Sequence, residues 1–389
     1  MRWLLRLPSV YLSVPMLIAC GVTRLTYDLP QDYEEGLLLL VAVAMLFVAL
    51  DALIGIRLPR IRLFRMRDYV GTREAFVALG FAAGVAVFCL LDLVLFPVPL
   101  LVNPTLYASM EGGHEHIRHI SDMCWVLCPI GMLCARRRWL RYALIATGLL
   151  FPILVIDRNR IFASLCSSAL VIALRRDETK PMPWKIIVFL AAVSATVFSV
   201  LGILRSGTLE YVTLPFSDMY RDAPQGVKWL LLYVSAGPYN FGAMLAKHYH
   251  NSSFLINQIV PLSGSIATAG TGIPLDADNI NVGTEYFPFL MAWGSLGAVA
   301  AMLTLYGLLL WSVRRLGTRI SLFALLIFLR VSYVCVMAPF APQAFTWTTG
   351  GFIALCLVMQ AVAAWLPNRK AGPVCQRERV LPGGIFPST

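Results

Sequence analysis

The sequence predicts an all-α protein that crosses a membrane about ten times as a bundle of transmembrane helices. Of its 389 residues 58% are hydrophobic and only 14% are charged, and the mean hydropathy is +0.73. Apolar runs of about 20 residues recur along the chain, and the hydrocarbon core of a bilayer requires helices of that length. The runs are continuous rather than alternating, which argues against a transmembrane β-barrel.

Ten segments fit a membrane-crossing helix, and the fourth to sixth are shorter than the rest. They are 9–27, 37–56, 74–97, 121–135, 142–156, 161–174, 186–204, 286–313, 320–340 and 349–366. We find no periodic repeat or long linker, so residues 1–389 are expected to form a single membrane domain. An even number of spans places both termini on the same side of the membrane.

Positive charge indicates which side that is. Most of the 32 basic residues fall in the loops and ends that share a face with the N-terminus, including the arginine-rich loop 57–73 and the tail 367–389. The opposite face carries acids, such as Glu34 and Glu35. Basic loops are typical of the cytoplasmic side, so both termini are expected to be cytoplasmic. The net charge of +11 then reflects orientation and contact with the lipid bilayer, and no nucleic-acid partner is expected.

The longest segment between predicted spans, 205–285, lies on the outer side. Its part 229–246 is apolar and aromatic but interrupted by Gly237 and Pro238, which predicts a pair of re-entrant or surface-lying helices. Its part 263–285 is rich in Gly, Ser, Thr and Asn. That composition favours a loop that hydrogen-bonds a polar ligand such as a sugar, and a disordered connector is the alternative.

Two arginines stand at a turn on the outer side, where basic residues are scarce. Arg158 and Arg160 lie in the tight turn that begins at Asp157, between two short spans. A guanidinium offers a planar fork of donors that suits phosphate, so the pair is a candidate site for a lipid-linked diphosphate. The alternatives are snorkelling to lipid headgroups or pairing with Asp157.

Arg330 lies in the middle of the span 320–340. An arginine at the centre of a bilayer costs about 2.5–3.5 kcal/mol on insertion scales, so it is expected to face a partner or a cavity. Asp51 and Asp92 are the acids deep in apolar spans, and an ion pair with either is the structural alternative. The functional alternative places Arg330 beneath an aqueous cavity that is open to the outside, where it attracts an anionic leaving group.

Glu285 opens the eighth span. An acid at a helix start interacts well with the helix dipole, and a general base for a sugar hydroxyl is the functional alternative. Arg205 ends the seventh span, where an interfacial anchor is the structural alternative. His116 and His119 are not arranged as in the HExxH motif of zinc enzymes, so we expect no metal. The chain contains no phosphate-binding loop, dinucleotide fingerprint or nucleophile elbow, and no cofactor is expected.

Four segments of this sequence resemble the O-antigen polymerases, the oligosaccharide repeat-unit polymerases of bacterial inner membranes. They are 157–160, 202–207, 233–241 and 279–289, the last leading into 293–297. The family often has an acid where this chain has Ala292. The resemblance covers roughly residues 150–360 in order.

The resemblance implies a metal-independent glycosyltransferase in the bacterial inner membrane, with its site on the periplasmic face. Such an enzyme polymerises undecaprenyl-diphosphate-linked oligosaccharide units for lipopolysaccharide or exopolysaccharide, and a chain-length regulator protein is a further expected partner. The residues that match the family's arginines are Arg158, Arg160 and Arg205. Cations fixed around the departing diphosphate act by electrostatic stabilisation.

Together these arguments give a candidate site. The expected catalytic residues are Arg158, Arg160, Arg330 and Glu285. The expected substrate-binding residues are Arg205, Arg221, Tyr239, Asn240, Asn279, Asn281, Thr284 and Tyr286. An O-antigen ligase that uses His248 or His250 stays an alternative, as do a polysaccharide flippase or permease that uses Arg330 with Asp51 and Asp92, and a structural scaffold.

Overall fold

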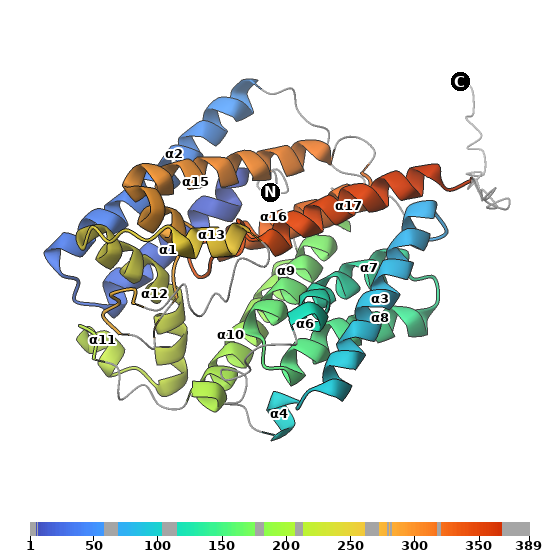
Figure 1. Ribbon diagram of the computed structural model, residues 1–389, viewed down its shortest axis with the longest axis horizontal. Helices are drawn as coiled ribbons and strands as arrows, with labels where there is room; N and C mark the ends of the chain where they lie inside the picture. The colour runs from blue at the N-terminus through green and yellow to red at the C-terminus, as the bar shows by residue number, and fades with distance from the viewer. Residues whose placement is uncertain are drawn as a thin grey trace, which may run out of the picture.

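The computed structural model describes residues 5, 7–57, 69–102, 115–175, 183–206, 213–260, 272–277, 280, 282–316 and 320–367. Within these ranges all regular structure is helical, and an isolated antiparallel bridge joins Tyr27 to Phe216 (Figure 1). The prediction of an all-helical membrane protein is confirmed for this part of the chain. Asn279 and Asn281 lie outside the described residues.

Each of the ten predicted spans coincides with helix. The long helices are α1 (Pro8–Thr26), α2 (Glu34–Arg57), α3 (Arg73–Leu95), α8 (Arg138–Leu154), α9 (Arg158–Arg175), α10 (Trp184–Ser206), α12 (Gln225–Ala246), α15 (Phe287–Arg315), α16 (Leu322–Met337) and α17 (Trp347–Trp365). The predicted span 121–135 is built from α6 (Glu115–Ser121), the 3-10 helix η3 (Asp122–Val126) and α7 (Leu127–Cys134). Short helices are η2 (Gln31–Tyr33), α4 (Pro99–Val102), α11 (Asp218–Arg221) and α13 (Ser253–Ile259).

Seven helical segments of the described chain are long and apolar enough to cross a membrane. They are Pro8–Thr26, Gln31–Leu53, Arg73–Val102, Ile117–Cys134, Trp184–Leu204, Phe287–Arg315 and Trp347–Trp365. Of the other predicted spans, α8 and α16 are short, with 17 and 16 residues, and α9 carries serines and arginines. The count of about ten spans therefore stays a prediction, while a multi-pass arrangement is well supported.

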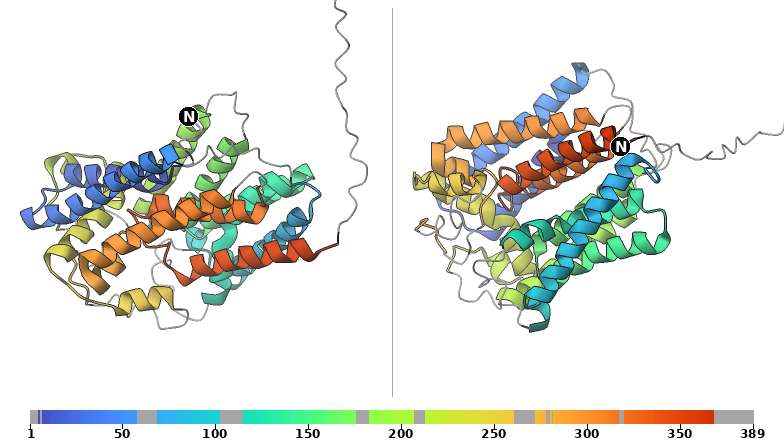
Figure 2. Two further views of the ribbon diagram at one scale, coloured as in Figure 1. Left: turned by 90° about the horizontal axis from the view of Figure 1, so that it is seen from above. Right: turned by 45° about the vertical axis from the view of Figure 1, so that its right-hand side comes forward.

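The helices gather in two groups that are joined by α16 and also by α10, which packs on α12 and on α9. Helices α1, α2, α12 and α15 pack together, and α3, α6, α7, α8 and α9 form the other group (Figures 1 and 2). Helix α16 contacts α1 and α15 of the first group, α3 and α9 of the second, and α17. A helix surrounded by protein on all sides has to be apolar all round, which explains its unbroken hydrophobic sequence.

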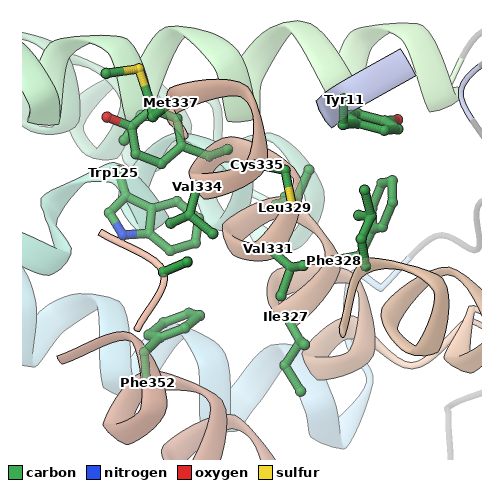
Figure 3. Packing of buried hydrophobic residues seen from close by; sticks show 14 of the residues in the cluster. Tyr11, Trp125, Ile327, Phe328, Leu329, Val331, Val334, Cys335, Met337 and Phe352 are labelled. Carbon is green, nitrogen blue, oxygen red and sulfur yellow. The ribbon is translucent and has the colours of Figure 1, made fainter. Parts of the chain in front are cut away.

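Figure 3 shows this core, with Tyr11 of α1, Trp125 of η3 and Phe352 of α17 around the side chains of α16. Every residue of α16 is buried except Arg330 and Val336. The half-buried position of Arg330 is therefore an exception on this helix. It shows where the packing around α16 opens.

The predicted helix pair at 229–246 is a single helix in the structure. Helix α12 is 22 residues long and contains Pro238 in its interior. A proline removes one hydrogen bond and bends a helix without having to end it, and the surrounding helices α1, α2, α10 and α15 hold α12 together. The break expected at Gly237 and Pro238 is thus not there.

Gly237 has a different role, because it lets α12 approach the chain after α16. A Cβ atom at this position would overlap the carbonyl oxygen of Pro339. Replacing Gly237 with alanine is expected to destabilise the protein by about 1–3 kcal/mol, the usual cost of overpacking. Thermal unfolding in detergent measures this. Gly307→Ala is the matched control, since a Cβ there meets nothing within 4 Å, and equal losses in both variants would contradict the prediction.

The segment 272–277 is tied to α12 and η2 through one carboxylate. Asp276 accepts hydrogen bonds from Lys247 Nζ at 2.6 Å, Tyr239 Oη at 2.8 Å and Tyr33 Oη at 2.9 Å. Burial opposes the ionisation of Asp276, but these three donors outweigh it and lower the pKa of its carboxyl. Tyr239, a predicted substrate-binding residue, is buried and thus serves to hold this segment.

A lowered pKa makes this attachment dependent on pH. The stabilisation from Asp276 is present above the unfolded value of about 3.9 and is lost as the pH falls through the lower folded value. We expect the protection of residues 272–277 from hydrogen exchange, relative to an unfolded chain at the same pH, to fall in acid, and Asp276→Asn to lower it at neutral pH as well. Unchanged exchange in Asp276→Asn at pH 7 would contradict this role.

Candidate functional site

A cavity of about 700 Å³ opens where the two groups of helices meet α16 and α17. Its walls come from α6 and η3, from α9, from α16, and from α17 with the loop before it. The lining residues are His119, Ile120, Asp122, Met123, Trp125, Asp157, Asn159, Arg160, Ala163, Arg330, Tyr333, Pro342, Gln343, Thr346, Trp347, Thr348, Gly351, Phe352 and Leu355. Segments about 170 residues apart along the chain thus line one cavity, and α16 contributes its arginine to it.

Arg330 lines this cavity and makes its hydrogen bonds to a neutral partner. Its Nη2 donates to Thr349 Oγ1 at 2.8 Å and its Nε donates to the same oxygen at 3.2 Å. Within the described ranges no carboxylate forms an ion pair with Arg330, although Asp122 and Glu285 lie near enough to act on its charge. The guanidinium therefore lies at the cavity wall without a carboxylate in direct contact with it.

The expected ion-pair partners of Arg330 are occupied elsewhere. Asp51 accepts hydrogen bonds from the Ser9 backbone nitrogen at 2.7 Å and from Tyr306 Oη at 2.6 Å. Asp92 accepts one from Ser121 Oγ at 2.7 Å. The structural alternative, an ion pair between Arg330 and Asp51 or Asp92, is not what this part of the chain forms.

Glu285 fixes the loop that forms one cavity wall. Its buried carboxylate accepts hydrogen bonds from the backbone nitrogens of Gln343, Ala344 at 2.7 Å and Phe345 at 3.0 Å. Its own backbone nitrogen donates to the carbonyl of Ala338 at 2.7 Å. Glu285 does not line the cavity. The carboxylate is thus engaged in holding the loop 338–346, and the geometry gives no support to its expected role as general base.

A chain of hydrogen bonds leads from this loop to Arg330. The Gln343 carbonyl, set by Glu285, accepts from Thr349 Oγ1 at 2.7 Å. That hydrogen bond directs the lone pairs of the Thr349 hydroxyl towards Arg330. Thr346 also donates to the Gln343 carbonyl, at 2.9 Å. The position of Arg330 is therefore determined by residues on three separate elements.

Removing the Thr349 hydroxyl tests this chain. Thr349→Val keeps the shape of the side chain but leaves Arg330 without its hydrogen-bond acceptor, and we expect activity of the site to fall about tenfold, in line with a charged hydrogen bond of about 1.5–3 kcal/mol. Thr349→Ser keeps the hydroxyl and is expected to retain most activity. Turnover of both variants is compared at equal amounts of folded protein. Equal activity of the valine and serine variants would contradict the positioning role.

Arg160 reaches the cavity from the first turn of α9. Asp157 caps this helix, with Oδ1 accepting from the Arg160 backbone nitrogen at 3.1 Å, and its Oδ2 lies 2.9 Å from Arg160 Nε. Arg160 Nη2 also pairs with Asp122 Oδ1. The preceding Ile156 has a φ of +56°, a conformation rare for β-branched residues, which turns the chain sharply from α8 into α9. The predicted alternative of pairing with Asp157 is thus realised.

Arg158 is directed away from the cavity. Its guanidinium lies 4.6 Å from the ring centroid of Phe198 on α10 and 5.7 Å from that of Tyr233 on α12, in cation–π contact with both. Arg158 is not among the lining residues. The structure therefore separates Arg158 from Arg160, which the sequence had placed together.

Asn240, Thr284 and Tyr286, three further expected binding residues, do not line the cavity. Asn240 is buried and donates to the carbonyls of Ile280 at 2.8 Å and Val282 at 2.7 Å. Thr284 and Tyr286 are also buried.

Neither of the two arginines predicted to bind substrate from the segment 205–285 is observed in the cavity. Arg221 is an exposed residue of α11 and lies 3.5 Å from Asp218. Arg205 belongs to the end of α10, but its side chain lies outside the described part of the structure. The cavity brings together Arg160 and Arg330 alone among the predicted arginines whose side chains are described.

Several lining residues were missed from the sequence. Asp122 lies at the start of the predicted span 121–135 and was assigned no role, and Gln343 and Trp347 lie in a segment with no motif. The rings of Trp347 and His119 lie nearly perpendicular to each other, with centroids 4.6 Å apart. The usable signal for Asp122 was an acid inside the short, cysteine-rich span 121–135. Among the described residues no group of three or more His, Cys, Asp or Glu side chains is arranged to hold a metal ion.

Comparisons of the chain with protein-family models, with curated proteins and with solved structures find no match. Function is therefore inferred from the cavity and its lining.

Proposed function

We propose that this protein is a membrane glycosyltransferase that polymerises oligosaccharide repeat units carried on undecaprenyl diphosphate, and that the cavity is its active site. The observation that carries the proposal is Arg330, a cation in the interior of an apolar helix that lines a cavity without an ion-pair partner among the described residues. Such a charge is costly inside a membrane protein and is retained where it acts on a ligand.

Arg330 supports diphosphate chemistry in particular. A guanidinium stays charged in a low-dielectric site and offers several donors to phosphate oxygens. Negative charge accumulates on the diphosphate as its bond to the sugar breaks, and a cation held in place beforehand stabilises that charge without reorganisation. Thr349 and the loop held by Glu285 provide this fixed position.

The remaining walls suit a sugar. The volume of about 700 Å³ fits the range of about 300–1,000 Å³ typical of small-molecule sites. Asn159, Gln343 and Thr348 offer amide and hydroxyl groups, and Trp347 offers an aromatic face. The proposal places the cavity on the periplasmic side of the inner membrane, with both termini in the cytoplasm.

Purified protein in lipid nanodiscs, supplied with lipid-linked repeat units alone, tests the proposal. We expect longer saccharides on the lipid carrier, resolved by mass spectrometry, with release of undecaprenyl diphosphate. A product that forms only when a lipid A core is added would instead indicate a ligase. Movement of the lipid-linked unit across a vesicle bilayer with no new glycosidic bond would indicate a flippase, and either result would refute the polymerase.

A further inference from the structure

Two carboxylates of the cavity wall share one arginine, Arg160, which can neutralise only one of them. One guanidinium lies between two carboxylates, those of Asp157 and Asp122. Asp157 is buried and is already committed, since it caps α9 and binds Arg160 Nε. If Asp157 balances the charge of Arg160, the carboxylate of Asp122 adds a further negative charge to this wall.

The two carboxylates differ in access. The side chain of Asp157 is 12% exposed and that of Asp122 is 42% exposed. Arg160 is the only side chain that binds the Asp122 carboxylate among the described residues. Its remaining oxygen surface is thus open to a molecule in the cavity.

Asp122 and Arg330 line the same cavity with opposite charges but form no ion pair. Opposite charges in a low-dielectric space attract strongly and pair unless both are held in place. Arg160 holds Asp122, and Thr349 holds Arg330. The fold therefore keeps an anion and a cation unpaired on the wall of the same cavity.

This arrangement matches the two charge requirements of glycosyl transfer. A departing diphosphate needs a cation, and an attacking hydroxyl needs a group that accepts its proton. His119 of α6, which precedes Asp122 in the chain, and Trp347 of α17 provide a polar and an aromatic surface for the acceptor sugar.

We infer that Asp122 is the general base for the acceptor hydroxyl; this inference rests on the proposed function. The hydroxyl oxygen of the acceptor forms a bond to the anomeric carbon of the donor sugar while the bond from that carbon to the diphosphate oxygen breaks. The hydroxyl proton passes to the Asp122 carboxylate and then to water. The diphosphate leaves with the bonding electron pair on the side of Arg330, and Arg160 positions Asp122 throughout.

The test compares a natural acceptor with azide, a nucleophile that has no proton to lose. Asp122→Asn and Asp122→Ser remove the base, and Asp218→Asn removes an exposed carboxylate outside the cavity as the control. Size-exclusion chromatography selects folded protein, and two neutral variants guard against failure of one to fold. Elongation of the lipid-linked saccharide and formation of glycosyl azide are measured for each, together with donor binding.

We expect Asp122→Asn or Asp122→Ser to lose elongation by about 100-fold or more, the usual contribution of a general base, while donor binding and azide transfer persist. Elongation within a few fold of wild type would overturn the inference. Loss of both reactions in folded variants would overturn it too, because Asp122 would then be needed for more than proton transfer. If wild-type protein forms neither product, the proposed function itself fails.

Discussion

Replacing Arg330 with methionine is expected to abolish chain elongation while the protein still inserts into the membrane. Methionine keeps an unbranched side chain of similar length, so α16 loses the charge with little change in packing. Preorganised charge stabilisation of this kind is worth about 10²–10³ in turnover. Because no ion pair joins Arg330 to a carboxylate within the described ranges, its loss leaves no buried anion unpaired. Elongation assays on purified protein at saturating donor measure the effect.

Two further variants serve as comparisons for Arg330→Met. Arg330→Lys keeps a positive charge but loses the planar fork, and we expect intermediate activity with weaker donor binding. Arg24→Met removes an exposed arginine that lies near Glu34 and outside the cavity, and we expect normal chain lengths. Wild-type elongation by Arg330→Met would show that the charge at the centre of α16 has no part in the chemistry.

Glu285→Ala is expected to produce the largest loss of stability. It leaves three backbone nitrogens without their acceptor, that of Ala344 in a buried place and those of Gln343 and Phe345 in partly buried ones. A buried donor left unsatisfied costs about 1–3 kcal/mol, so three of them are expected to cost about 3 kcal/mol or more. The loop 338–346 would loosen, and Arg330 would lose the support of Gln343 and Thr349. Thermal unfolding and elongation are expected to fall together.

Glu35→Ala is the matched control for this loss, since Glu35 is an exposed acid at the start of α2. An exposed substitution of this kind changes stability by about 0.5 kcal/mol or less. Glu285→Gln adds a second comparison, because it retains an acceptor oxygen but turns an amide donor towards the loop. Stability of Glu285→Ala within about 1 kcal/mol of wild type would contradict the bonding described for this carboxylate.

The parts of the fold that follow from hydropathy were predictable. Each apolar run of the sequence coincides with a helix, because a membrane leaves the backbone few other ways to satisfy its hydrogen bonds. Hydropathy also singled out Arg330, because it is an arginine in the middle of an apolar span. The continuity of α12 was missed, since the sequence does not show that four neighbouring helices support it through Pro238.

Partners across the fold were not predictable from local patterns. Glu285 was expected to act as a base or to interact with the dipole of α15, but its acceptors are used by amides about 60 residues further along the chain. Arg158 and Arg160 are two positions apart on a helix, so their side chains diverge, one towards Phe198 and the other towards the cavity. Asp122 gains its importance only from tertiary contact with Arg160.

A structure of the protein with an unreactive undecaprenyl diphosphate sugar bound tests the account most directly. We predict that the diphosphate lies in the cavity, with its oxygens within ion-pair distance of the Arg330 guanidinium and its sugar towards Asp122. A diphosphate bound at Arg158, or on the 205–285 segment away from α16 and α17, would contradict the assignment of this cavity as the active site.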